Sequence, residues 1–154
     1  MSTILLSFDA DTFLRMEKGE KKFEHRKHLP DGETTVYFYV SNPIKAISGV
    51  AQFGCREELV SWLDIYADRP QEVIDRIKDY LTDCNFVAPI KSFQPTNRIS
   101  LDKLRNDNPG FIVPRMYYYL DNHPLLGYLR NELKPVGNTI NHSFEMIADD
   151  DICN

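Results

Sequence analysis

The run TVYFYV at residues 35–40 constrains the fold of this chain more than any other stretch. Each of its residues is β-branched or aromatic, a composition that fits the pleated surface of a sheet and is typical of strands. Strand character recurs in the apolar run at 4–8 and in the alternating residues at 22–27 and 44–53. The first third of the chain therefore predicts four strands, and Gly49 inside the last of them predicts a bulge or a close backbone approach.

Short helical patterns separate and follow these strands. Asp9 or Asp11 is placed to cap a helix after the first strand, and Gly19 stands where a left-handed residue ends such a helix. Apolar residues recur at helical spacing over 57–67 and 71–81, which predicts two inserted amphipathic helices. Strands followed by inserted helices and a further strand indicate an α+β fold with a small, mostly antiparallel sheet or barrel.

The last part of the chain carries weaker patterns. A strand is expected at 86–93, and short helical pieces are expected at 100–104 and 117–120. Prolines are frequent beyond residue 108 and favour irregular structure there. The segment 138–154, with its three consecutive aspartates, is expected to be a loosely attached tail.

Composition narrows the possible partners. A net charge of −5 disfavours the broad basic surface that grips long duplex DNA, so we expect no extended duplex among the partners. Cys55, Cys84 and Cys153 lie far apart and form no C-x-x-C pair, which favours a reducing, cytoplasmic compartment over a disulfide framework or a zinc site. No apolar run approaches the ~18 residues of a membrane span, and no phosphate-binding glycine loop is present. We therefore expect neither a membrane partner nor a cofactor.

The sequence GEKKFEHRK at 19–27 places a basic patch on this acidic chain. From Arg15 to His28, six lysines and arginines face three glutamates, which leaves a net charge of +3. Such a patch can hold a few phosphates. His25 and His28 stand three positions apart and hence on opposite faces of a strand, and no third ligand is near, so no metal site is expected.

Several motifs follow one another in a recognisable order over residues 3–120. After the run ILLSF and a helix comes a G-x-K-x-x-E-x-R motif formed by Gly19, Lys21, Glu24 and Arg26. The stretches VYFYVSNP, ISGVAQFG, FVAPIKSFQPTNRISLDKLR and FIVPRMYYYL follow it. In this order the chain resembles the ASCH domain of the PUA-like superfamily.

The resemblance implies both an architecture and a binding site. It implies a small PUA-like β-barrel of five to six mostly antiparallel strands with flanking and inserted short helices, spanning residues 1–125. Residues 126–154 would form a C-terminal extension with an acidic end. It also implies a cleft beside the motif that binds single-stranded RNA or a modified nucleoside or nucleotide. The candidate ligand-binding residues are Lys21, Glu24, Arg26, Ser41, Arg115 and Tyr117.

In this hypothesis Lys21 and Arg26 meet phosphate, and the carboxylate of Glu24 accepts a hydrogen bond from a base amino group. The competing explanation is that Glu24 and Arg26 form a structural ion pair. The aromatic residues of 35–40 are expected to pack in the core rather than to stack on bases.

Two other functions stay open. One subset of the family hydrolyses the amide of N4-acetylcytidine, with a threonine nucleophile three residues after the motif lysine. Here Glu24 takes that place, so an amidohydrolase would need Lys21 as general base and Glu24 to position a water. The family's final Pro-Gln-Ser turn is Pro114-Arg115-Met116 here, which loses a hydroxyl and adds a cation. The third possibility is a protein-interaction domain without a ligand.

Overall fold

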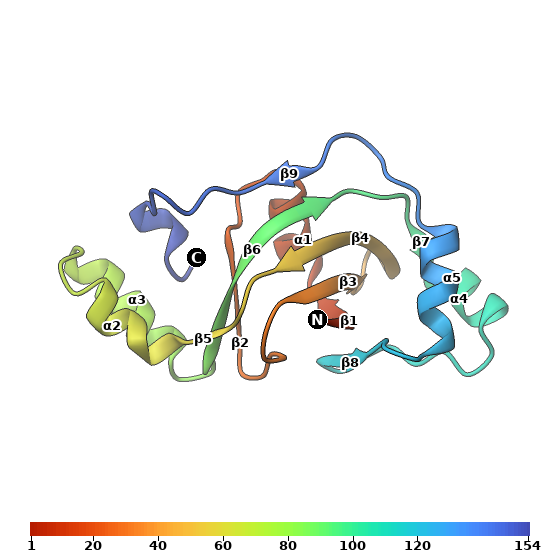
Figure 1. The fold of residues 1–154 in the computed structure, drawn as a ribbon, viewed down its shortest axis with the longest axis horizontal. Coiled ribbons are helices and arrows are strands. Elements are labelled where there is room, and N and C mark those ends of the chain that lie inside the picture. Colours follow the sequence, from red (N-terminus) through yellow and green to blue (C-terminus); the bar gives the residue numbers. More distant parts are fainter.

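Figure 1 shows a curled sheet with helices at both of its ends. The computed structural model describes all residues from 1 to 154. The strands are β1 (Ser2–Phe8), β2 (Phe23–Arg26), β3 (Thr34–Val40), β4 (Ala46–Phe53), β5 (Glu57–Glu58), β6 (Phe86–Gln94), β7 (Ile99–Ser100), β8 (Tyr117–Tyr119) and β9 (Ile140–Asn141). The α-helices are α1 (Ala10–Glu17), α2 (Trp62–Ile65), α3 (Gln71–Tyr80), α4 (Leu101–Asp107) and α5 (Pro124–Glu132), and the 3₁₀ helices are η1 (Leu59–Ser61) and η2 (Asp149–Asp151).

The sheet has one principal path in the order β2-β6-β4-β3-β1-β8. All neighbours on this path are antiparallel except β1 and β3, which the intervening α1 and β2 connect as a parallel pair. The end strands β2 and β8 do not pair with each other, so the sheet curls into a half-barrel and stays open. This architecture confirms the predicted α+β class with a small, mostly antiparallel barrel-like sheet and short helices.

Gly49 sits at the irregularity that the sequence predicted in the fourth strand. Its φ of +82° lies in the left-handed region that glycine adopts freely. A Cβ atom here would stand 2.5 Å from Cε1 of Phe93. The register between β3 and β4 shifts between Tyr37 and Tyr39, opposite this glycine. A bulge and a close approach therefore occur at the same residue.

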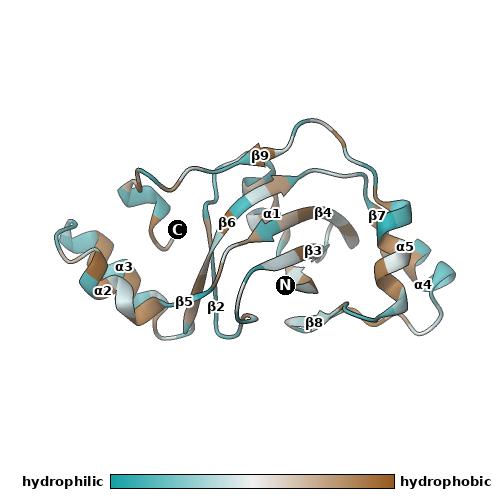
Figure 2. Cartoon of the chain, in the orientation of Figure 1, coloured by the Kyte–Doolittle hydropathy of each residue, from teal (hydrophilic) through white to brown (hydrophobic).

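Three apolar clusters hold the half-barrel together. The first fills the inside of the curl between α1 and the central strands and includes Phe13, Phe38 and Phe93. The second packs α4 and α5 against the opposite face of β1, β3 and β4, and the third joins β2 and β6 to α2, α3 and the chain end. Figure 2 shows hydrophobic residues along the central strands and hydrophilic ones over much of the outer helices and loops. None of the helices combines the length and apolar character needed to cross a membrane.

Two local predictions in the middle and late chain differ from the structure, one in the type of element and one in its bounds. The segment 117–120 was expected to be helical, yet Tyr117–Tyr119 forms strand β8 and pairs with Leu6, Leu5 and Ile4 of β1. Pairing with the exposed edge of β1 overrides any local helical preference of this short stretch. In the predicted helix 57–67, the first two residues instead pair with β6, and the helical part is confined to 59–65.

The C-terminal third is more ordered than its prolines suggested. Helix α5 differs from the irregular structure that the prolines favour: Pro124 stands in its first turn, where proline is compatible with a helix. The expectation of a loose tail at 138–154 was also wrong. Ile152 and Cys153 are buried in the third cluster, and Lys22 Nζ donates to the carbonyl of Ser143 at 3.1 Å. Apolar burial and these polar contacts fix the segment in place.

Candidate functional site

A cavity of about 450 Å³ opens where the ends of β1 and β2 meet α1. It is lined by Ser7, Phe8, Asp9, Thr12, Arg15, Lys21, Glu24, His25, Arg26, Ser41, Tyr80, Arg115 and Asn154. Among these are four cations (two on the motif, and Arg15 and Arg115) and two carboxylates. The side chains that line the cavity therefore sum to a net charge of +2 in a chain whose net charge is −5.

Three motif residues form a charged triad in the cavity wall. Lys21 Nζ lies 3.6 Å from Oε1 of Glu24, and Arg26 donates to Oε2 of Glu24 from Nη2 at 3.2 Å and from Nε at 3.3 Å. The backbone N–H of His25 donates to Oε1 of Glu24 at 3.1 Å. The side chains of Lys21 and Glu24 are each 6% exposed. The ion pair proposed as the competing explanation is thus present, and it lines an open cavity as well.

Local structure explains why the motif forms this triad. Gly19 has a φ of +75° and ends α1, and β2 follows as the last strand of the sheet path. Glu24 and Arg26 are two residues apart on that strand and so share one face. The side chain of Arg26 crosses from this face to β1, where Nη2 donates to the carbonyl of Ser7 at 2.8 Å and the guanidinium lies 5.4 Å from the ring centre of Phe8.

The start of α1 forms another part of the wall. Asp9 caps this helix by accepting hydrogen bonds from Thr12, from the backbone N–H at 2.8 Å and from the hydroxyl at 2.6 Å. Burial alone would raise the pKa of Asp9, but the Thr12 hydrogen bonds and the charges of Lys21 and Arg26 hold it below its usual value. Asp9 is therefore a carboxylate at neutral pH, and both of its oxygens accept hydrogen bonds from Thr12 at the start of α1.

His25 is a third buried polar residue of the site, beside Lys21 and Glu24. It is 8% exposed and lies edge-on to the rings of Trp62, at 5.6 Å, and Tyr80, at 5.0 Å. Neither ring nitrogen has a hydrogen-bond partner. Burial, with a smaller contribution from the charge of Lys21, lowers the pKa of His25 to about 3. The imidazole is consequently neutral near pH 7 and packs as an aromatic ring.

The structure brings together five of the six residues expected to bind ligand. Ser41 and Arg115 line the same cavity as the triad, although they lie in distant parts of the sequence. Tyr117 does not line it. Its half-buried ring packs against the first apolar cluster and lies edge-on to Tyr119 at 5.8 Å, because β8 directs it toward the sheet.

Other lining residues were not predicted as site residues. Arg15 was counted in the basic patch but not placed in the site; its position one helical turn before Gly19 was the available signal. Tyr80, at the end of α3, and Asn154 carry no local signal, because only the packing of α3 and the C-terminal segment beside β2 brings them to the cavity.

A second cavity, of about 590 Å³, lies between the start of α5 and the loop after α4. Its wall is largely apolar and includes Phe111, Ile112 and Tyr118. Its one carboxylate, Asp107, already binds Lys103 at 2.7 Å. This cavity contains none of the predicted site residues. No group of three or more histidine, cysteine, aspartate or glutamate side chains that would suit a metal ion occurs in the structure.

Comparison with known proteins gives a likeness in fold. No protein-family model and no curated protein matches the sequence. Among solved structures, the ASCH protein from Zymomonas mobilis superposes with a TM-score of 0.65 at 18% identity over 86% of this chain and 96% of that chain. A serine-to-alanine variant of that protein superposes with a TM-score of 0.65 at 18% identity, over 86% of this chain and 97% of that chain. A tyrosine-to-phenylalanine variant superposes with a TM-score of 0.65 at 17% identity, over 87% of this chain and 100% of that chain.

Proposed function

We propose that this chain, which has the fold of an ASCH domain, binds a nucleotide or a short single-stranded RNA in the cavity beside Lys21, Glu24 and Arg26. The observation that carries this proposal is the charge of the cavity. A net charge of +2 is concentrated in one hollow of a protein that is otherwise acidic. Such a hollow attracts small anionic ligands and concentrates the field of its cations.

The size and chemistry of the cavity suit a single nucleotide. About 450 Å³ lies within the roughly 300–1,000 Å³ typical of small-molecule sites. Tyr80 contributes aromatic surface, and a base stacked on such a ring is stabilised by about 1–3 kcal/mol. Both oxygens of Glu24 already accept hydrogen bonds, from His25 and from Arg26, so recognition of a base amino group by this carboxylate stays a prediction. A hollow of this size accepts one extruded or single-stranded nucleotide rather than a duplex.

Fluorescence anisotropy with labelled single-stranded RNA hexamers of each of the four bases tests the proposal. We expect saturable binding of at least one hexamer, weaker binding of the matching duplex, and at least about tenfold weaker binding by Lys21→Ala. Lys103→Ala is the matched control, since Lys103 also pairs with a carboxylate but lies outside the cavity. Equal affinities of the wild type and Lys21→Ala, or no binding of any hexamer, would contradict the proposal.

The other two predicted functions have less support. In an amidohydrolase Glu24 would have to position a water, yet its two oxygens already take hydrogen bonds from Arg26 and His25 and contact Lys21. No contact in the cavity favours hydrolysis of N4-acetylcytidine, so that activity stays a prediction. An interaction domain without ligand is the outcome that complete absence of nucleotide binding would support.

A further inference from the structure

The four cations of the cavity fall into two kinds. Lys21 and Arg26 are bonded to Glu24, so part of their charge is offset within the protein. Arg15 and Arg115 line the same cavity, but their side chains form neither an ion pair nor a hydrogen bond within the protein. A phosphate beside Lys21 or Arg26 would be repelled by the carboxylate of Glu24. A phosphate beside Arg15 or Arg115 would contact a guanidinium that has no counter-charge in the protein.

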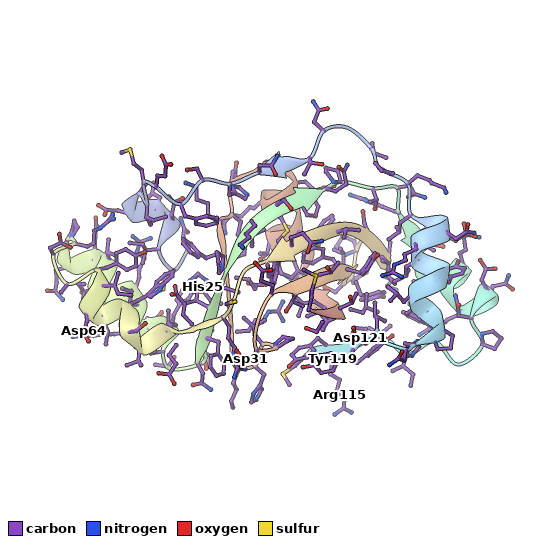
Figure 3. All side chains as sticks on the ribbon, viewed as in Figure 1. His25, Asp31, Asp64, Arg115, Tyr119 and Asp121 are labelled. Carbon is purple, nitrogen blue, oxygen red and sulfur yellow. The ribbon has the colours of Figure 1, made fainter.

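The two unpaired arginines reach the cavity from different segments of the chain. Arg115 precedes Met116, whose carbonyl accepts from the N–H of Ser7, and the carbonyl of Ser7 accepts from Arg26. Figure 3 labels Arg115 below β8 and His25 near β2.

Arg15 lies in the last turn of α1 and lines the cavity together with Tyr80, at the end of α3. Tyr80 in turn packs edge-on against His25, the residue next to Glu24. Arg115 thus lines the cavity from the segment before β8, and Arg15 lines it from α1.

We infer that Arg15 and Arg115 bind two phosphates on either side of one nucleotide, while the triad contacts its base and sugar. This inference rests on the proposed function and specifies its ligand: an internal nucleotide of a single-stranded RNA, which carries a phosphate on each side. This assignment differs from the roles predicted from the sequence, because Arg15 and Arg115, rather than Lys21 and Arg26, recognise the phosphates. Guanidinium groups suit this role, since they bind phosphate oxygens bidentately.

Calorimetric titration with four forms of one nucleoside tests the two subsites separately. The base is the one whose hexamer binds best, and the probes are the nucleoside, its 5′-monophosphate, its 3′-monophosphate and its 3′,5′-bisphosphate. For the wild type we expect each phosphate to tighten binding by roughly tenfold or more. In Arg15→Ala, one of the two phosphates should no longer tighten binding, and in Arg115→Ala the other should no longer do so. In the double variant neither phosphate should tighten binding.

The salt dependence of hexamer binding provides a second measurement that a structural role would not change. For single strands the slope of log K against log salt concentration is about −0.7 per neutralised phosphate, so each alanine variant should reduce it by about 0.7. Arg15→Lys and Arg115→Lys should keep the slope, because they keep the charge. Arg105→Ala is the matched control, since Arg105 is exposed on α4, outside the cavity.

The outcomes separate this inference from the proposed function. If the wild type binds hexamers but the bisphosphate binds no tighter than a monophosphate, or both alanine variants lose the same increment, the two-phosphate arrangement is wrong and nucleotide binding stands. Unchanged salt slopes in both alanine variants lead to the same conclusion. If the wild type binds no nucleotide at all, the proposed function fails and the inference falls with it.

Discussion

The Nη2 atom of Arg26 donates a hydrogen bond to the backbone carbonyl of Ser7 at 2.8 Å, and this bond joins two strands that share no backbone pairing. β2 pairs with β6 alone on the sheet path, whereas β1 pairs with β3 and β8. The same guanidinium holds the carboxylate of Glu24 in the cavity wall. The candidate site therefore also bridges the open side of the half-barrel, so substitutions here affect stability as well as binding.

Glu24→Ala should lower the free energy of unfolding by roughly 3–5 kcal/mol, because it leaves the buried ammonium of Lys21 without its counter-charge. Urea denaturation followed by circular dichroism measures the loss. Glu33→Ala is the control: Glu33 pairs with Lys91 at 2.6 Å, but both side chains are about half exposed, so the loss should be much smaller than that of Glu24→Ala. Similar losses in the two variants would show that burial of the triad contributes nothing.

Stability should fall as the pH falls below 6.5, in part because of His25. Its pKa is about 3 in the folded protein, against 6.5 for the free side chain, so between these values the unfolded state binds a proton that the folded state does not. The resulting loss approaches about 1.4 kcal/mol per pH unit. Between pH 7 and pH 5 the wild type should therefore lose about 2 kcal/mol more than His25→Phe, which keeps the aromatic packing and removes the titration. Parallel urea curves of the two proteins at both pH values are the measurement, and equal losses would disprove this role.

Gly49→Ala should destabilise the fold by at least about 2 kcal/mol, because it combines an unfavourable positive φ with a collision against the ring of Phe93. Gly32→Ala separates the two effects. Its φ is +79°, but no atom lies within 4 Å of an added Cβ, so only the backbone cost of about 1 kcal/mol remains. Thermal or urea unfolding of both variants distinguishes them. If Gly32→Ala costs as much as Gly49→Ala, the close approach of Phe93 is unimportant.

Ile152→Ala should cost roughly 2–5 kcal/mol, since this residue is fully buried beside Trp62 and Ile77 in the third cluster. Met146→Ala, in the same segment but 84% exposed, should change the free energy of unfolding by no more than about 0.5 kcal/mol. Limited proteolysis should also cut the segment faster in Ile152→Ala than in the wild type. A negligible cost for Ile152→Ala would mean that the C-terminal segment is not part of the folded core in solution.

The sequence predicted well those elements whose cause lies within a few residues. The strand at 34–40 follows from its β-branched and aromatic residues, and α1 from an aspartate cap and a glycine stop. The pairing of Glu24 with Arg26 follows from the two-residue period of a strand. Predictions were wrong where distant partners decide, as in β8, whose tyrosines pair with β1, and at the chain end, whose Ile152 enters a core built by α2 and α3.

By itself, then, the sequence determined a strand-rich α+β chain and a local Lys21, Glu24 and Arg26 constellation, because propensity, caps and side-chain periodicity act over one or two turns or strand repeats. Only the tertiary structure decided what completes the cavity. Arg15, Tyr80 and Arg115 come from three separate segments, and the packing of the apolar clusters places them around the motif. The net gain in free energy from burying these clusters depends on contacts between residues far apart in the chain, which no local pattern encodes.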